Sequence, residues 1–188
     1  MHILYREFPE SVMVSGRSYA IETDFREWIR FLELAEDEEV PWQIKGQLIL
    51  QWFTSEVPED IEQAIYALGD FCSGYSDSGD QAEGRVRTKQ VYSFEQDADC
   101  IYTAFREVYG INLQTVPYMH WWEFQTLLLG LPEKTEIKQR MMYRSIDLRD
   151  VKDKNERKRI QKIQKSIALK KKRRARKMDP YEIGEMFW

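Results

Sequence analysis

Few residues in this chain of 188 could carry acid–base or nucleophilic chemistry. Of its two histidines, His120 could pair with a carboxylate and act as a general base. A lone histidine in an aromatic segment is, however, more often a packed residue whose ring nitrogens are hydrogen-bonded. The carboxylate pairs Asp97/Asp99 and Asp77/Asp80 have the positions of helix-start and loop residues. We therefore expect no catalytic residues.

Metal and cofactor sites are not indicated either. The two cysteines, Cys72 and Cys100, lie on the apolar sides of predicted helices, and no Cys or His spacing matches a zinc site. Two reduced thiols are the expected state. The chain has no glycine-rich phosphate loop, no dinucleotide-binding turn, no nucleophile elbow and no zinc-protease His pair. We predict that the protein is not an enzyme and needs no metal or cofactor.

A run of cations near the end of the chain could bind phosphates, because clustered Lys and Arg release counterions from a nucleic-acid backbone. Docking on an acidic protein surface and simple solvation are the alternatives. No aromatic residue lies between positions 150 and 178, so a stacking platform for single strands is absent. We favour a contact with protein over nucleic acid. The candidate contact residues of this basic arm are Lys170, Lys171, Lys172, Arg173, Arg174, Arg176 and Lys177.

Charge divides the chain into two parts. Residues 150–178 hold 14 of the 28 Lys and Arg residues and three acidic residues, a net charge of +11. Because the whole chain carries −4 and the last ten residues −3, the first 149 residues carry −12. We predict an acidic core over residues 1–149 and a basic C-terminal arm with an aromatic end over residues 150–188.

The elements around these residues predict a mainly α protein: a compact domain of about six helices, a small N-terminal β-hairpin and a basic C-terminal helix. Residues 11–14 and 19–22 form the expected strands, with Gly16 in the turn and the first helix as support. That helix begins at Thr23 or Asp24. A second begins at Pro41, and its apolar residues cover so much of the circumference that burial on several sides is expected.

Further helices are expected from Pro58, over residues 95–109, after Pro117 and over residues 135–143. Residues 73–84 are rich in Ser, Gly and Asp and predict a mobile loop. In the basic helix only Ile160, Ile163 and Ile167 share a side, so only a narrow stripe can dock. The start of the chain has no export signal, and no window is apolar enough for a membrane span.

The aromatic residues raise the question of partners. Neighbours on a helix point about 100° apart, so Trp121 and Trp122 are awkward to bury on one face, and one of them could line a second surface. The terminal Phe187 and Trp188 either fold back onto the core or anchor in a partner's groove. The candidate partner-binding residues are Trp121, Trp122, Phe124, Tyr143, Arg144, Phe187 and Trp188.

Two segments, residues 118–132 with the sequence YMHWWEFQTLLLGLP and residues 142–148 with the sequence MYRSIDL, resemble the bacteriophage family known as gene product fifteen. The segments 92–98, 101–105 and 19–26 are similar too. The resemblance spans roughly residues 10–170, and the last eighteen or so residues are less typical.

The resemblance implies a protein of long-tailed phages and prophages of Gram-positive hosts, encoded beside the tape-measure protein. Its implied role is that of a tail assembly chaperone, which would bind the tape-measure protein until tail-tube subunits polymerise around it. The partners would be the tape-measure protein, then tail-tube subunits, with self-association as a further alternative. It would act in the host cytoplasm and be absent from the mature virion. The alternative function is nucleic-acid binding through residues 150–178.

Overall fold

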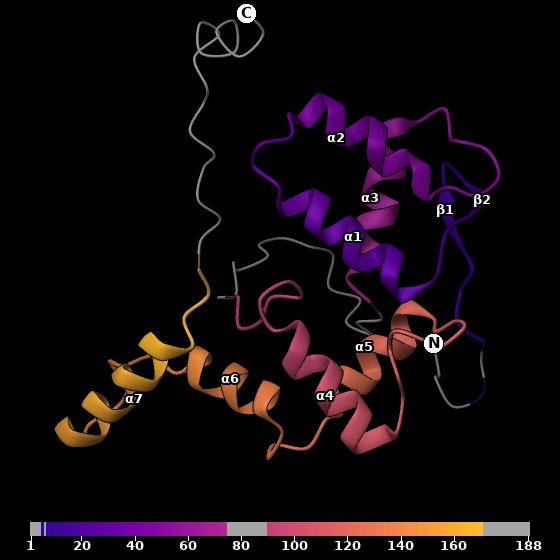
Figure 1. The fold of residues 1–188 in the computed structure, drawn as a ribbon. Helices are drawn as coiled ribbons and strands as arrows, with labels where there is room; N and C mark the ends of the chain where they lie inside the picture. Colours follow the sequence, from indigo (N-terminus) through magenta and orange to yellow (C-terminus); the bar gives the residue numbers. More distant parts are fainter. Residues whose placement is uncertain (1–4, 6, 75–89, 171–188) are drawn as a thin grey trace, which may run out of the picture.

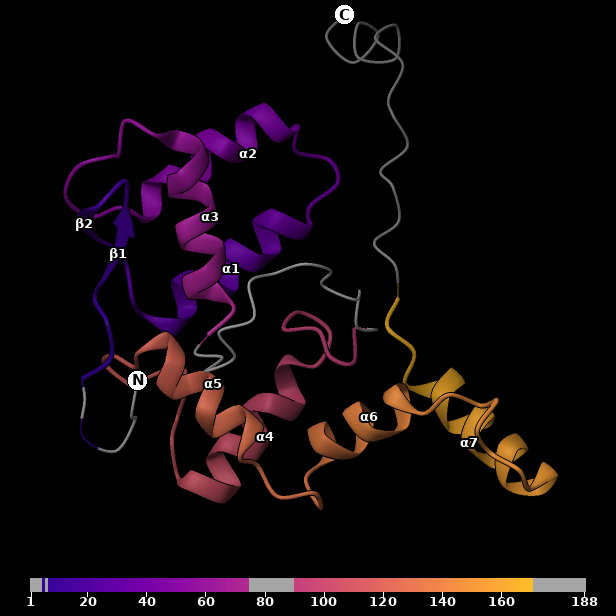
Figure 2. The same ribbon diagram turned by 180° about the vertical axis from the view of Figure 1, so that it is seen from behind.

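The computed structural model describes residues 5, 7–74 and 90–170, and within them seven α-helices and one β-hairpin. The mainly α prediction is therefore confirmed. In Figure 1 the hairpin lies with helices α1, α2 and α3, helices α4 and α5 form a second group below them, and α6 and α7 extend to one side. The view from behind shows the same arrangement (Figure 2). No helix among the described residues is long and apolar enough to cross a membrane.

The hairpin consists of β1 (Ser11–Val14) and β2 (Arg17–Ala20), paired antiparallel with Met13 opposite Ser18. Its turn is tighter than predicted, because Ser15 and Gly16 both have positive φ angles (49° and 80°), as a two-residue turn of the primed type requires. The sequence analysis predicted that the hairpin packs on the first helix, α1. This prediction is wrong, because the hairpin packs chiefly on α3. The Ser15 N–H donates to Oε1 of Gln63 on α3 at 3.2 Å, which fixes the turn there.

Helix α1 (Phe25–Glu36) begins at a predicted cap, where Asp24 accepts a hydrogen bond from the Arg26 N–H at 2.9 Å. It buries Phe25, Trp28 and Phe31. Helix α3 (Ile61–Cys72) begins at Asp60, which accepts from the Gln63 N–H, so the cap and not Pro58 sets its start. Its buried residues are Ala64, Leu68, Phe71 and Cys72.

Helix α2 (Trp42–Ile49), followed by a short 3-10 turn (Leu50–Trp52), is much less buried than predicted. Only Lys45 and Ile49 of this helix are buried, whereas Trp42 is 64% exposed. The buried side of the helix is polar in part: the Lys45 ammonium donates to the Ala35 carbonyl at the end of α1 at 2.8 Å. A cation at a helix C-terminus is favourable, so this contact and the buried Ile49 hold α2, and most of its apolar residues are left outside the core.

The remaining helices are α4 (Ala98–Tyr109), α5 (Trp121–Leu129), α6 (Glu136–Ser145) and α7 (Lys154–Ser166). Gly110 ends α4 with a φ of 70°, as its position in the sequence predicted. Helix α5 starts later than expected, because residues just before it are extended: the Phe25 N–H donates to the Met119 carbonyl, and the Trp121 N–H to the Thr23 carbonyl. These two bonds join α1 to α5.

The core is centred on Phe124 of α5, which is fully buried. Its ring stacks on Phe25 of α1 at a centroid distance of 4.7 Å, on Phe105 of α4 at 5.1 Å and on Trp121 at 5.8 Å. Three helices therefore meet on one aromatic side chain.

Replacing Phe124 with Ala should lower the free energy of unfolding by about 3–5 kcal/mol, since the cavity would remove the ring contacts of α5 with α1 and α4. Urea unfolding followed by circular dichroism measures this loss. The matched control is Leu129→Ala on the same helix, whose side chain is 63% exposed and whose loss should change stability by less than about 0.5 kcal/mol. Equal effects of both substitutions would contradict this view of the core.

Candidate functional site

The residues that could do chemistry serve the fold. No three His, Cys, Asp or Glu side chains among the described residues come together in a group that could hold a metal ion. Burial raises the pKa of the Cys72 thiol to about 12, so this cysteine stays protonated and unreactive at neutral pH. Cys100 is half-buried, and both cysteines are free thiols.

His120 is the N-cap of α5 and is buried. Its Nδ1 accepts from the Trp122 N–H at 3.0 Å, which leaves the proton on Nε2, 3.1 Å from the Pro9 carbonyl oxygen. Phe8 stacks on the ring at 4.8 Å. Burial lowers the pKa of His120 below its ordinary value near 6.5, so the ring is neutral at pH 7. The prediction of a packed histidine with both nitrogens satisfied is confirmed.

The two tryptophans after His120 bind the end of another helix. The Trp121 indole donates to the Cys72 carbonyl at 2.8 Å, and the Trp122 indole donates to the Phe71 carbonyl at 2.9 Å. Gln125, one turn later, donates to the same Cys72 oxygen at 3.1 Å. These side chains bind carbonyls of the last turn of α3, where the helix leaves acceptors over; the Phe71 carbonyl also accepts from the Gly74 N–H at 3.1 Å. Both neighbouring tryptophans therefore contact the core side of the molecule, because each indole binds a different carbonyl at the end of α3.

The one buried charge cluster described by the structure lies at the start of α4. The Asp97 carboxylate, which has no solvent exposure, accepts from both terminal nitrogens of Arg144, at 2.6 and 2.9 Å. It also accepts from Arg140 at 3.0 Å and from the Ser93 N–H at 3.0 Å. Arg140 and Arg144 are one turn apart on α6, so one helix face supplies both cations. We call these three residues the Asp97 cluster.

The balance of forces at Asp97 favours the ionised form. Burial alone would raise the pKa of this carboxyl, but the hydrogen bonds from Arg144, Ser93 and Arg140 and the charge of Arg144 outweigh it and lower the pKa. The stability that this carboxylate contributes is therefore present at neutral pH. It is lost only as the pH falls below the usual carboxyl range and through the lowered pKa.

Arg144 also holds the segment that follows α7. Its Nε donates to the Ile167 carbonyl at 2.7 Å, and one of its terminal nitrogens donates to the Val91 carbonyl at 3.0 Å. Nearby, the Gln96 side chain exchanges two hydrogen bonds with the backbone of Lys170. Gln164 of α7 donates to the carbonyls of Tyr143 and Ile146, at the end of α6. The Asp97 cluster thus fixes the C-terminal end of the basic helix against the core.

The structure reassigns several candidate partner-binding residues. Trp121, Phe124 and Arg144 are buried, so none of them offers a surface to a partner in this fold. Trp122 and Tyr143 are half-buried. Of the seven candidate contact residues of the basic arm only Lys170 is described, and it contacts the core through its backbone. The other candidates lie outside the described residues: Lys171, Lys172, Arg173, Arg174, Arg176, Lys177, Phe187 and Trp188. Of the predicted mobile loop, residues 73–84, only Ser73 and Gly74 are described.

Exposed apolar side chains give a better indication of a binding surface. Ten large ones are exposed among the described residues, and five of these fall between residues 42 and 66: Trp42, Ile44, Val57, Ile61 and Tyr66. Sequence reasoning missed them because an apolar residue in a predicted helix is normally assigned to the core. The sequence did contain a signal: the apolar residues of the second helix lie on most of its circumference. A helix that contacts the core along one side cannot bury all of them.

Comparison with known proteins gives one family. The family model described as Bacteriophage Gp15 protein matches residues 4–169. No curated protein and no solved structure matches the chain.

Removing the charge of Asp97 with the isosteric Asp97→Asn should lower the free energy of unfolding by about 3–5 kcal/mol, because buried Arg144 would lose its counter-charge. Urea unfolding measures the loss. Hydrogen exchange should also show faster exchange in α7. The control is Arg149→Gln, which breaks the exposed ion pair between Arg149 and Asp147 and should leave the unfolding midpoint unchanged. An Asp97→Asn protein as stable as the parent would refute the role of the cluster.

Stability should fall as the pH drops through about 6.5. The pKa of His120 is lowered in the folded state, so in this range the unfolded chain binds a proton that the folded protein excludes. His120→Asn keeps a side-chain acceptor at the N-cap and removes the titrating group. The parent should therefore lose more stability between pH 7 and pH 5 than this variant does, measured by thermal unfolding. Identical pH profiles would assign the loss to other groups.

Proposed function

Because the chain belongs to the Bacteriophage Gp15 protein family and is thus a phage-related protein, we propose that it assists tail assembly by binding the tape-measure protein before tail-tube subunits polymerise around it. In this proposal it acts in the host cytoplasm, without catalytic turnover, and leaves before the virion is complete. Family membership over residues 4–169 is the observation that carries the proposal.

The exposed apolar residues of α2 support a binding role. Trp42 and Ile44 are 64% and 48% exposed, on a short helix held to the core mainly by Lys45 and Ile49. Exposed tryptophans are costly in water and are the residue type most often responsible for binding energy at protein interfaces. An apolar stretch of a tape-measure helix could cover these side chains and be displaced later, because no covalent step is needed.

Co-expression tests the role directly. The protein produced together with a fragment of the tape-measure protein encoded beside it should elute from gel filtration as a complex. Separate elution of the two proteins under all conditions would remove the basis of the proposal.

The double substitution Trp42→Ala/Ile44→Ala should weaken this complex by at least about tenfold, since hot-spot residues each contribute about 2 kcal/mol or more. Calorimetric titration with the tape-measure fragment measures the affinity. Folding should be unaffected because both side chains are exposed. The matched control is Leu129→Ala/Met142→Ala, which removes two other exposed apolar side chains and should leave the affinity unchanged. Equal loss in both variants would place the binding surface elsewhere.

A further inference from the structure

Helix α7 carries a line of four lysines that its packing on the core leaves in solvent. Ile160 is its one buried residue, and all four lysines are exposed. They follow one another at intervals of four, four and three residues and therefore lie along one face, opposite Ile160. Within the described part of the chain none of them has an ion-pair partner. We call Lys154, Lys158, Lys162 and Lys165 the lysine stripe.

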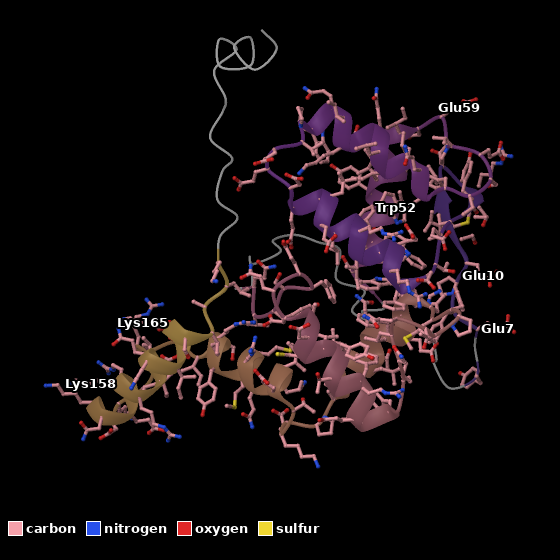
Figure 3. The ribbon with its side chains drawn as sticks, in the orientation of Figure 1. Glu7, Glu10, Trp52, Glu59, Lys158 and Lys165 are labelled. Atoms are coloured by element: carbon pink, nitrogen blue, oxygen red, sulfur yellow. The ribbon has the colours of Figure 1, made fainter. Side chains whose placement is uncertain are left out.

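Among the described residues, no acidic side chain pairs with the lysine stripe to relieve the repulsion within it. Like charges three or four residues apart on a helix destabilise it. Figure 3 shows Lys158 and Lys165 on the part of the molecule that α7 extends away from the core, while Glu59 lies at the opposite end. The hydrogen bonds of Arg144 and Gln164 lie near the C-terminal end of the helix, and Ile160 packs in its middle. The stripe is thus presented outward and away from the acidic groups at that opposite end.

Helix α3 presents the complementary pattern. Its exposed residues Glu62, Tyr66 and Asp70 follow one another at intervals of four and lie opposite the buried Ala64 and Leu68. Glu59, just before the Asp60 cap, is also exposed and adds another acidic residue at the start of the helix. The helix itself contains no Lys or Arg. We call Glu59, Glu62, Tyr66 and Asp70 the acidic stripe.

We propose that the lysine stripe of one copy docks on the acidic stripe of a second copy, with α7 and α3 antiparallel. In this register Lys162 faces Glu62, Lys158 faces the Tyr66 ring and Lys154 faces Asp70. Steps of four residues rise about 6 Å in both helices, so the contacts stay aligned along their length. The antiparallel direction also directs Lys165 toward the start of α3, where Glu59 lies, and it sets opposite ends of the two helix dipoles side by side.

A second copy fits these features better than a nucleic acid does. Phosphates would meet the lysine stripe but would be repelled by the first 149 residues, whose net charge is −12. Residues 150–178 offer no aromatic side chain on which bases could stack. A nucleic acid also gives the acidic stripe no role. Contact between copies uses both stripes at once.

The position of the two stripes limits the assemblies that can form. They lie on helices α3 and α7, which are in separate parts of the fold (Figures 1 and 2), so each contact joins unlike faces. Two copies can close the contact twice around a twofold axis, or further copies can add head to tail. Either assembly would be weak and salt-sensitive, because its charges are exposed and screened over about 8 Å at physiological ionic strength.

Charge reversal tests the contact. Sedimentation velocity at low salt should show self-association of the parent protein that disappears as salt is added. Lys162→Glu/Lys165→Glu and Glu59→Lys/Glu62→Lys should each weaken association by at least about tenfold. The protein carrying all four substitutions should associate again, since the paired charges are exchanged. An equal mixture of the two double variants should form a mixed complex for the same reason.

The controls separate this contact from general charge effects and from the tape-measure proposal. Lys134→Glu/Lys152→Glu changes the net charge by the same amount at exposed positions outside α7 and should leave association unchanged. Circular dichroism checks that every variant is folded. A parent protein that stays monomeric at low salt, or a fourfold variant that fails to associate, would overturn the proposal. The proposal would also be overturned if the parent protein bound duplex DNA and did not self-associate, and if Lys162→Glu/Lys165→Glu abolished the DNA binding. None of these results depends on binding of the tape-measure protein.

Discussion

The arrangement of the C-terminal half depends on the buried charge of Asp97. A carboxylate without solvent must be paired, and here two arginines from one face of α6 and a backbone N–H provide the pairing. A hydrophobic contact in its place would tolerate sliding of α6 over α4, whereas a two-pronged Arg144–Asp97 contact fixes one position and one rotation. Because Arg144 also binds the Ile167 carbonyl, the same charge pair determines where the basic helix ends.

The aromatic residues divide between two tasks. Most of them form a continuous core from Trp28 and Phe31 of α1 through Phe124 of α5 to Phe105 of α4. Trp121 and Trp122 add polar bonds to the packing, since each indole donates to the end of α3. The aromatic wealth of the sequence is therefore mainly a means of folding. Among the described residues, half of the exposed large apolar side chains lie between residues 42 and 66, and we propose that this set serves partners.

Local sequence signals predicted the elements well, because caps and turns act over a few residues. Asp24 and Gly110 mark helix ends as expected, and the stripe of Ile160, Ile163 and Ile167 docks as predicted. Long-range choices could not be predicted. Arg144 is an ordinary exposed residue by type, and only the approach of α4 makes it the partner of Asp97, 47 residues away in sequence. Packing of the hairpin on α3 likewise depends on a contact between Ser15 and Gln63 that no local pattern encodes.

The charge division along the sequence becomes a separation in space because of how α7 is held. The helix is held by the bond from Arg144 to the Ile167 carbonyl, by the Gln164 side chain and by the isoleucine stripe with Ile160. None of these contacts uses the lysines of the helix. Had the basic helix folded back along the acidic core, its cations would have been neutralised within the chain. Holding the helix by these groups leaves opposite charges on different surfaces of one molecule. Such a molecule attracts its own kind more readily than it attracts a uniform polyanion, and salt concentration sets how strongly.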